Sequence, residues 1–198
     1  MNYYGPKSEI VSLSKHLYGK GLVTGYDGNI SFKKEDGTYL VTKTGICKKY
    51  IDEADVLNVT KDGTLISGPG KCTTVVHAHP LKATSLTFID KEYLLCKNIV
   101  PEVTSQIGSV HTVPYFTPGS EELATAVQEV LVYNTDCNFI MLKQYGIIGI
   151  GTNLMQICMH IEKIEYLADI IINTNFVPRE LTSEEVEDLK KYKYPTLK

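Results

Sequence analysis

The chain has 198 residues, a net charge of −3, a hydrophobic fraction of 43% and a charged fraction of 22%. These values are typical of a globular protein and exclude a disordered, collagen-like or low-complexity chain. The pI is near 6.0 and no long basic run occurs, so nucleic acid is not an expected partner. No apolar run approaches the roughly 20 residues of a membrane-spanning helix, so no membrane partner is expected either.

The length predicts one domain over residues 1–198, with a short tail from about residue 178. Five cysteines are spread along the chain without a CxxC pair, which favours reduced thiols over a disulfide framework. The first residues, MNYYGPKSE, lack the apolar core of a secretion signal. We therefore expect a cytoplasmic protein.

The first third of the chain predicts a helix followed by hairpins. Pro6 suits a first helical turn, and apolar residues recur at helical spacing until the glycines at 19 and 21. Asp-Gly dipeptides at 36–37 and 62–63 are strong hairpin signals. The expected elements are a helix over 6–19 and strands over 29–32, 39–42, 56–59 and 64–67.

The remainder alternates between strands and helices without a regular βα repeat. This order predicts a mixed α/β fold with a partly antiparallel sheet and helices on both faces. The expected strands are 72–77, 111–116, 139–142 and 147–150; the expected helical segments are 81–98 (helix and loop), a helix opening at 118–122, a long helix over 153–175, a helix start at 181–185 and a loose end over 190–198.

Two histidines, His77 and His79, are separated by one residue in a predicted strand. Because side chains alternate between the faces of a strand, both imidazoles point to the same side. They form half of a zinc site, but a catalytic zinc ion needs three protein ligands and an open position. The alternative is two polar residues on a solvated strand face, and spacing assigns no third ligand among His16, His111 and His160.

Glycine-containing turns at residues 25–29 and 43–45 are rich in hydroxyl and amide groups. Backbone N–H groups in such turns can hold an anion. Such turns are common in proteins, however, so their spacing alone does not establish an anion site.

Five segments occur in a fixed order: GLVTGYDGNISF, YLVTKTG, VVHAHP, VPYFTPGSEELA and MLKQYGIIGIG. Together they resemble the class II aldolase/adducin family, which includes fuculose-phosphate aldolase, ribulose-phosphate 4-epimerase and the adducin head domain. The resemblance covers about residues 8–172. It implies a three-layer α/β fold in which helices cover both faces of a mixed sheet.

The resemblance also implies a chemistry. In the family, Zn²⁺ held by three histidines polarises the carbonyl of a ketose phosphate and stabilises the enediolate formed when a C–C bond breaks. A glutamate moves protons and a tyrosine protonates the leaving aldehyde oxygen. The phosphate binds to an Asn turn, a Thr-Gly turn and a Ser/Thr pair. Members are commonly homotetramers with sites at subunit interfaces, so a phosphorylated sugar and further copies of the chain are the implied partners.

Carried onto this chain, the resemblance implies that His77 and His79 bind the metal. It implies that Tyr115 is the catalytic tyrosine, for which a buried structural tyrosine is the alternative. The implied phosphate site consists of Gly28, Asn29, Thr44, Gly45, Thr73 and Thr74.

The first departure from the family pattern precedes the His-x-His strand. The family has a Lys-Pro-Thr/Ser-Ser-Glu segment and then a helix, but here Lys71-Cys72-Thr73-Thr74 runs directly into Val75. The glutamate and the helix are absent. Since loss of a core helix would expose apolar sheet surface, we expect further residues in the polypeptide between Thr74 and Val75. The alternative is a true deletion, closed by a tight turn at Gly68-Pro69-Gly70.

The second departure is Tyr145, which takes the place of the third histidine ligand. A tyrosine binds Zn²⁺ only as phenolate, and its reference pKa is about 10. Three functions therefore stay open. The chain is an active metal-dependent lyase or epimerase on a small phosphorylated ketose, a non-catalytic binding or assembly module, or an enzyme with an altered metal site that uses Tyr145 or His111.

Overall fold

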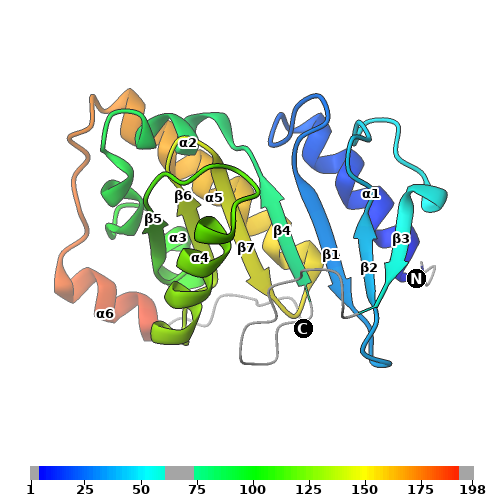
Figure 1. Cartoon of the computed structure of the whole chain (residues 1–198). Helices are drawn as coiled ribbons and strands as arrows, with labels where there is room; N and C mark the ends of the chain where they lie inside the picture. Colours follow the sequence, from blue (N-terminus) through cyan, green and yellow to red (C-terminus); the bar gives the residue numbers. More distant parts are fainter. Residues whose placement is uncertain (1–4, 61–73, 192–198) are drawn as a thin grey trace.

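The computed structural model describes residues 5–60 and 74–191 and is built on a seven-stranded mixed sheet (Figure 1). The strand order is β3-β2-β1-β4-β7-β6-β5. All neighbouring strands are antiparallel except β5 and β6, which are parallel. The strands are β1 (Asn29–Lys33), β2 (Tyr39–Thr42), β3 (Val56–Val59), β4 (Thr74–Ala78), β5 (Val110–Val113), β6 (Phe139–Leu142) and β7 (Gly146–Gly151).

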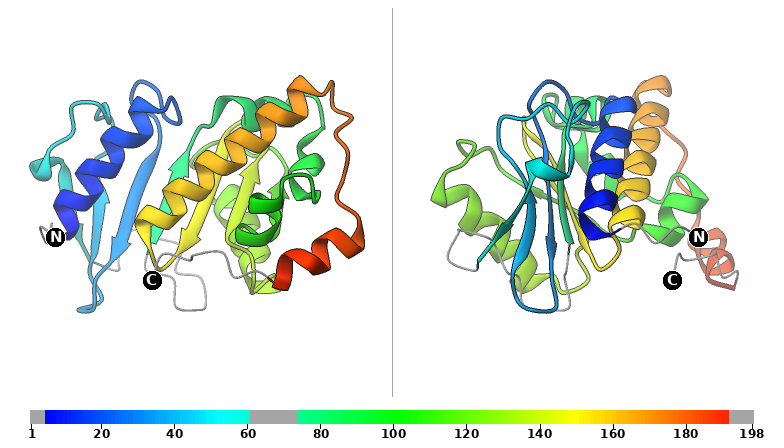
Figure 2. Two further views of the ribbon diagram at one scale, coloured as in Figure 1. Left: turned by 180° about the vertical axis from the view of Figure 1, so that it is seen from behind. Right: turned by 90° about the vertical axis from the view of Figure 1, so that its right-hand side faces the viewer.

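Helices lie on both faces of the sheet, which confirms the predicted three-layer fold. Helices α1 and α5 lie side by side on one face, and α4 lies on the other (Figure 2). The helices are α1 (Pro6–Gly19), α2 (Leu81–Thr87), α3 (Pro101–Gln106), α4 (Glu121–Tyr133), α5 (Leu154–Asn173) and α6 (Ser183–Lys191), with short 3-10 turns η1 (Glu53–Asp55) and η2 (Glu92–Cys96).

Local sequence signals account for several element boundaries. Pro6 occupies the first turn of α1, where its missing N–H costs no hydrogen bond. The side chains of Ser120 and Asn153 cap α4 and α5. Each side-chain oxygen accepts a hydrogen bond from the backbone N–H of the residue three positions later. In the β1–β2 hairpin, Asp36 accepts a hydrogen bond from the Thr38 backbone N–H at 2.9 Å, as the Asp-Gly turn predicts.

The hydrophobic core has two parts, one on each side of the sheet. The larger part packs α1 and α5 against the sheet and includes the fully buried Ile30, Val76 and Ile161. The smaller part lies under α4 and includes Val113 and Ile140. Helix α4 contacts the sheet at its β5 end. On the face that α4 occupies, no described helix covers β1, β2 and β3.

Apolar side chains on that face are partly exposed. Leu57 on β3 points to it and is 43% exposed, and Val41 on β2 is only half-buried. Strand β4 runs through Thr74 and Val75 without interruption, pairing in register with β1 and β7. The expectation of further residues between Thr74 and Val75 stays a prediction.

Three expectations for single elements need adjustment. Helix α3, a six-residue helix that begins at Pro101, was not predicted because it is too short to show helical periodicity. Strand β5 ends at Val113 rather than 116, since Pro114 lacks a backbone donor. Lys190 and Lys191 belong to α6 and not to a loose end. The predicted strand 64–67 and the turns at 61–63 and 68–70 lie outside the described residues.

Among the described residues, no helix is long and apolar enough to cross a membrane.

Candidate active site

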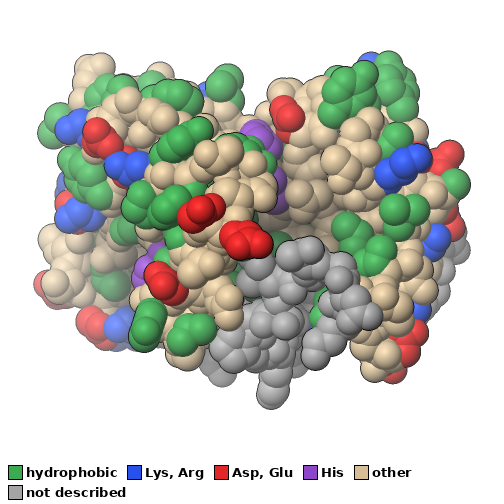
Figure 3. Space-filling view, viewed as in Figure 1, with side chains coloured by type: hydrophobic (Ala, Val, Ile, Leu, Met, Phe, Trp, Pro, Cys, Tyr) green, Lys and Arg blue, Asp and Glu red, His purple; other side chains and the backbone are tan. Residues whose placement is uncertain are grey.

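Three aromatic rings, two from the end of β4 and one from the β6–β7 turn, come together at the centre of one face. The ring centroids of His77 and His79 are 4.6 Å apart, and that of Tyr145 lies 4.7 Å from His77 and 5.2 Å from His79. We call these three residues the ring cluster. Figure 3 shows histidine side chains in a hollow between the two halves of this face.

His77 is fixed in one orientation by a backbone contact. Its Nδ1 lies 3.1 Å from the carbonyl oxygen of Ile147 on β7, so Nδ1 carries the proton and donates. Nε2 is buried and has no hydrogen-bond partner. Burial lowers the pKa of His77 from 6.5 to about 4, with a smaller contribution from His79. Near neutral pH, His77 therefore presents an uncharged nitrogen with a free lone pair.

His79 follows the end of β4 and is held from both sides. Its backbone N–H donates to the Leu22 carbonyl at 2.6 Å, and its ring is hydrogen bonded to the Tyr145 backbone. Burial lowers the pKa of His79, against the opposing effects of the Asp27 charge and this hydrogen bond. Both histidines are thus oriented by backbone groups of the β6–β7 region, an arrangement typical of metal-binding imidazoles.

Tyr145 is placed by a tight turn between β6 and β7. Gln144 has a left-handed backbone, with φ of 57°, and its N–H donates to the Thr87 hydroxyl at 2.9 Å. Lys143 pairs with the buried Glu92 at 2.9 Å. Burial raises the pKa of the Tyr145 phenol, and the Asp27 charge adds to the rise. Tyr145 stands beside the histidines as the resemblance implies, but its surroundings oppose the phenolate.

A glycine lets the chain approach His77 closely. Gly28 has φ of 71°, and a Cβ there would lie 2.5 Å from Val23 Cγ1 and 2.8 Å from the His77 carbonyl oxygen. Any other residue would be strained and would push β4 away. Gly28 therefore sets the distance between the turn before β1 and the ring cluster.

The implied phosphate residues do not all lie at this place. Asn29 is exposed and pairs directly with His77 in the β1–β4 register. Thr44 and Gly45 are exposed in the turn that follows β2. Thr74 is 1% exposed within β4, and its part in a phosphate site stays a prediction. Thr73 lies outside the described residues.

Two further candidates belong to β5 and the segment that follows it. Tyr115 is 56% exposed in the segment after β5, which contradicts the alternative of a buried structural tyrosine. His111 on β5 is in register with Ile140, which pairs with Ile148, the partner of His77. Three inter-strand spacings, about 14 Å, therefore separate the two histidines. His111 cannot share an ion with His77 in the same chain.

The residues at the ring cluster fit a divalent metal in part. His77 and His79 supply two neutral, oriented nitrogen donors, and the orphaned buried Nε2 of His77 lacks any other partner. Tyr145 fits as a third donor only when deprotonated. In residues 5–60 and 74–191, no group of three His, Cys, Asp or Glu side chains is arranged to hold a metal ion.

Two residues near the cluster were not singled out from the sequence. Asp27 precedes Gly28, and its charge acts on all three rings. Lys48 is 3% exposed, and its Nζ donates to the Ile46 carbonyl at 3.0 Å. Burial lowers the pKa of Lys48, whereas the charges of Cys47 and Asp27 raise it. Lys48 stands between Cys47 and Lys49, and the sequence gives no sign of its burial. Asp27 lies inside a turn that the sequence analysis did single out.

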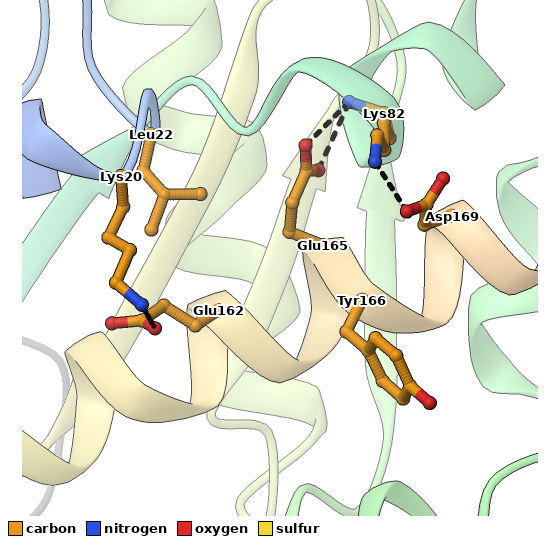
Figure 4. Close-up of a pocket in the computed structure, with 7 residues that line it drawn as sticks. All are labelled: Lys20, Leu22, Lys82, Glu162, Glu165, Tyr166 and Asp169. Carbon is orange, nitrogen blue, oxygen red and sulfur yellow. Dashed lines mark hydrogen bonds and ion pairs between the residues drawn. The ribbon is translucent and has the colours of Figure 1, made fainter.

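A second pocket lies on the opposite side, between α1, α2 and α5 (Figure 4). Lys20 pairs with Glu162 at 3.1 Å, and Lys82 pairs with Asp169. Glu165 accepts hydrogen bonds from the backbone N–H groups that begin α2. These charged groups hold the three helices together. The pocket is lined by Lys20, Leu22, Lys82, Glu162, Glu165, Tyr166 and Asp169.

A family model described as the class II aldolase and adducin N-terminal domain matches residues 8–172. The chain belongs to this family. The match spans the sheet, the ring cluster and α1 to α5, so the resemblance drawn from the five sequence segments is confirmed.

The relatives are lyase-type enzymes by name. The chain is 29% identical to 3-oxo-tetronate 4-phosphate decarboxylase of Escherichia coli O6:H1, over 93% of this chain and 94% of the relative. It is 26% identical to L-fuculose phosphate aldolase of Methanocaldococcus jannaschii, over 84% and 95%. The structure of YgbL from Klebsiella pneumoniae superposes with a TM-score of 0.76 at 27% identity, covering 92% of this chain and 96% of that one.

Proposed function

We propose that this chain is a metal-dependent lyase that breaks a carbon–carbon bond in a small phosphorylated sugar. The observation that carries the proposal is the ring cluster: two oriented, uncharged imidazoles, one with a buried nitrogen that has no partner, beside an exposed asparagine turn. Family membership and the names of the relatives support the same reaction class.

His77 and His79 would hold the metal, with zinc as the ion that two imidazoles suit best. A divalent cation there would draw electrons from the substrate carbonyl and so stabilise the negative charge that develops when the bond breaks. Both rings are held by backbone groups, His77 by the Ile147 carbonyl on β7 and His79 by the Tyr145 backbone in the turn before it. The pKa of about 4 at His77 keeps protons from competing for that nitrogen at neutral pH.

The phosphate would bind where Asn29 and the Thr44–Gly45 turn present amide and hydroxyl donors. Asn29 pairs with His77 across the sheet, so a phosphate at Asn29 would place the rest of a small sugar next to the rings. Hydrogen bonds from uncharged donors to a phosphate fix its position without a fixed positive charge.

Tyr115 would protonate the leaving aldehyde oxygen. It is 56% exposed in the segment after β5. A homo-oligomer, with the tetramer of the family as the expected form, would bring Tyr115 of one copy toward the rings of another.

The second candidate function is a binding or assembly module without catalysis. It is favoured by one observation, the raised pKa of Tyr145 in the third ligand position. An altered metal site with His111 is not pursued, because His111 is three strands from His77.

Calorimetry with dihydroxyacetone phosphate, a small ketose phosphate, tests the proposed site in protein supplied with Zn²⁺. Asn29→Asp adds a negative charge beside the phosphate and should weaken binding by more than tenfold, or about 1.4 kcal/mol. Asn138→Asp, an exposed change in the turn before β6, is the matched control and should leave binding unchanged. Equal affinity in wild type and Asn29→Asp would remove Asn29 from the site.

Cleavage separates the two functions. An enzyme binds Zn²⁺ with one ion per chain and splits a ketose 1-phosphate into two products detectable by mass spectrometry, and His77→Ala abolishes both. A binding module gives no cleavage at any zinc concentration. That result would overturn the proposed lyase activity.

A further inference from the structure

Lys48 is the one buried lysine among the described residues, and it follows the Thr44–Gly45 turn closely. It is 3% exposed, and its Nζ donates a hydrogen bond to the Ile46 carbonyl at 3.0 Å. This carbonyl belongs to the residue directly after Gly45, and consecutive Cα atoms are about 3.8 Å apart. Because Thr44 and Gly45 are exposed and Lys48 is buried, the ammonium group lies beneath the turn.

No carboxylate neutralises this ammonium at close range. None of the ion pairs among the described residues includes Lys48, whereas the more exposed Lys143 pairs with Glu92 at 2.9 Å. The Ile46 carbonyl accepts one of the three hydrogen bonds that an ammonium can donate. A charge that is taken out of water without a counter-charge costs free energy. A bound anion would supply the missing counter-charge.

The ammonium also lies near the turn that precedes β1. Burial lowers the pKa of Lys48, and the charges of Cys47 and Asp27 raise it. Asp27 is two residues before Asn29, and its exposed carboxylate accepts a hydrogen bond from the Thr24 hydroxyl at 3.1 Å. It acts on Lys48 from a distance and not through an ion pair. Lys48 is therefore close to both turns that contain the implied phosphate residues.

We propose that Lys48 supplies the positive charge of the phosphate site from beneath the Thr44–Gly45 turn. This inference rests on the proposed function, because it takes the phosphate to bind at Asn29 and at this turn. The uncharged donors of the turn would position the phosphate, and the ammonium would attract its negative charge. Lys43 and Lys49 are also close in sequence, but both are exposed, so water and salt screen their charges more strongly.

The proposal predicts opposite effects on ligand binding and on stability. Removing the charge of Lys48 should weaken phosphate binding. The same change should not destabilise the ligand-free protein, because it removes a buried charge that has no close counter-charge. A lysine that served only to hold the Ile46 carbonyl would behave differently. Its loss would lower the free energy of unfolding, and a variant that keeps an uncharged donor would keep full affinity.

Calorimetry with dihydroxyacetone phosphate compares wild type with Lys48→Met and Lys48→Gln in proteins saturated with Zn²⁺. Methionine removes the charge and the donor, whereas glutamine keeps a donor without the charge. Lys49→Met removes the same charge from the exposed neighbour and is the matched control. Since zinc is present in every protein, its charge does not enter the comparison. Urea unfolding of the ligand-free proteins gives the stability of each variant.

We expect both Lys48 variants to bind the ligand at least tenfold more weakly than wild type, with a free energy of unfolding equal to or above that of wild type. Lys49→Met should bind within twofold of wild type. Wild-type affinity in Lys48→Gln, equal weakening in Lys49→Met, or weaker binding together with lower stability in both Lys48 variants overturns the inference alone. Failure of wild type to bind the ligand overturns the proposed function together with it.

Discussion

The two charged regions of this molecule differ in how completely their polar groups are paired. In the pocket between α1, α2 and α5, Glu165 caps the start of α2, and the two lysines pair with acidic residues of α5. At the ring cluster, His77 Nε2 is buried without a partner. Both regions hold polar groups where elements meet, but only at the ring cluster does a buried nitrogen keep an unused lone pair.

This difference teaches how to separate structural charge from functional charge. A paired network stabilises the fold, and its loss appears in the free energy of unfolding. An unpaired buried nitrogen stabilises nothing by itself and is retained at a cost. Variants in the pocket should therefore change stability alone, whereas variants at the ring cluster should change metal and ligand binding.

The largest expected effect is at Gly28, where the ring cluster depends on a close backbone approach. Gly28→Ala combines a left-handed backbone with a clash against Val23 and the His77 carbonyl, so it should reduce the free energy of unfolding by about 4 kcal/mol. Gly37 also has a positive φ, of 81°, but open space around it. Gly37→Ala should cost about 1 kcal/mol. Urea unfolding measures both, and equal losses would contradict the role of the close approach.

The second effect is the pH dependence of stability in metal-free protein. The unfolded chain protonates His77 near pH 6.5, but the folded chain does so only near pH 4. The free energy of unfolding should therefore be highest above about pH 6.5 and should fall as the pH drops to about 4. His77 alone should account for a loss of about 3 kcal/mol. Burial also lowers the pKa of His79, so this residue should add to the loss of stability at low pH.

Urea unfolding from pH 7 to pH 4 in the presence of a chelator measures this loss. His77→Gln cannot take up the proton, so its stability should depend less steeply on pH. Parallel curves for wild type and His77→Gln would mean that the imidazole is not buried as described.

A smaller effect is expected at the third ligand position. Because burial and Asp27 raise the pKa of Tyr145, wild type should bind Zn²⁺ weakly at pH 7 and more tightly as the pH rises to 9. Tyr145→His supplies a neutral nitrogen and should bind at least tenfold more tightly at pH 7, or about 1.4 kcal/mol. Zinc titrations against a competing chelator decide the matter. Tight and pH-independent binding by wild type would mean that another group completes the site.

The smallest effect is expected in the pocket. Glu165→Gln weakens the hydrogen bonds to the backbone N–H groups of Lys82 and Ala83, so stability should fall by about 1 kcal/mol. Zinc affinity and ligand affinity should stay at wild-type values. A change in either would show that the pocket and the ring cluster are coupled and that the contrast between them fails.

Much of the fold could be predicted from local patterns. The helical spacing of Ile10, Leu13 and Leu17, the Asp-Gly turn at 36–37 and the long apolar period after Asn153 each specify one element, and all three elements are present. The pattern also identified the shared face of His77 and His79. It could not identify α3, whose six residues are too few to show a period.

The sequence by itself thus determined the elements, the family and the pair of histidines, because these follow from neighbours along the chain. Only the tertiary structure decided which distant groups meet. It placed Glu165 at the start of α2. It also placed His111 three strands away from His77. The physical reason is that burial, the local electrostatic field and strand register are set by residues far away in sequence. Ile147, for example, orients His77 from 70 positions along the chain.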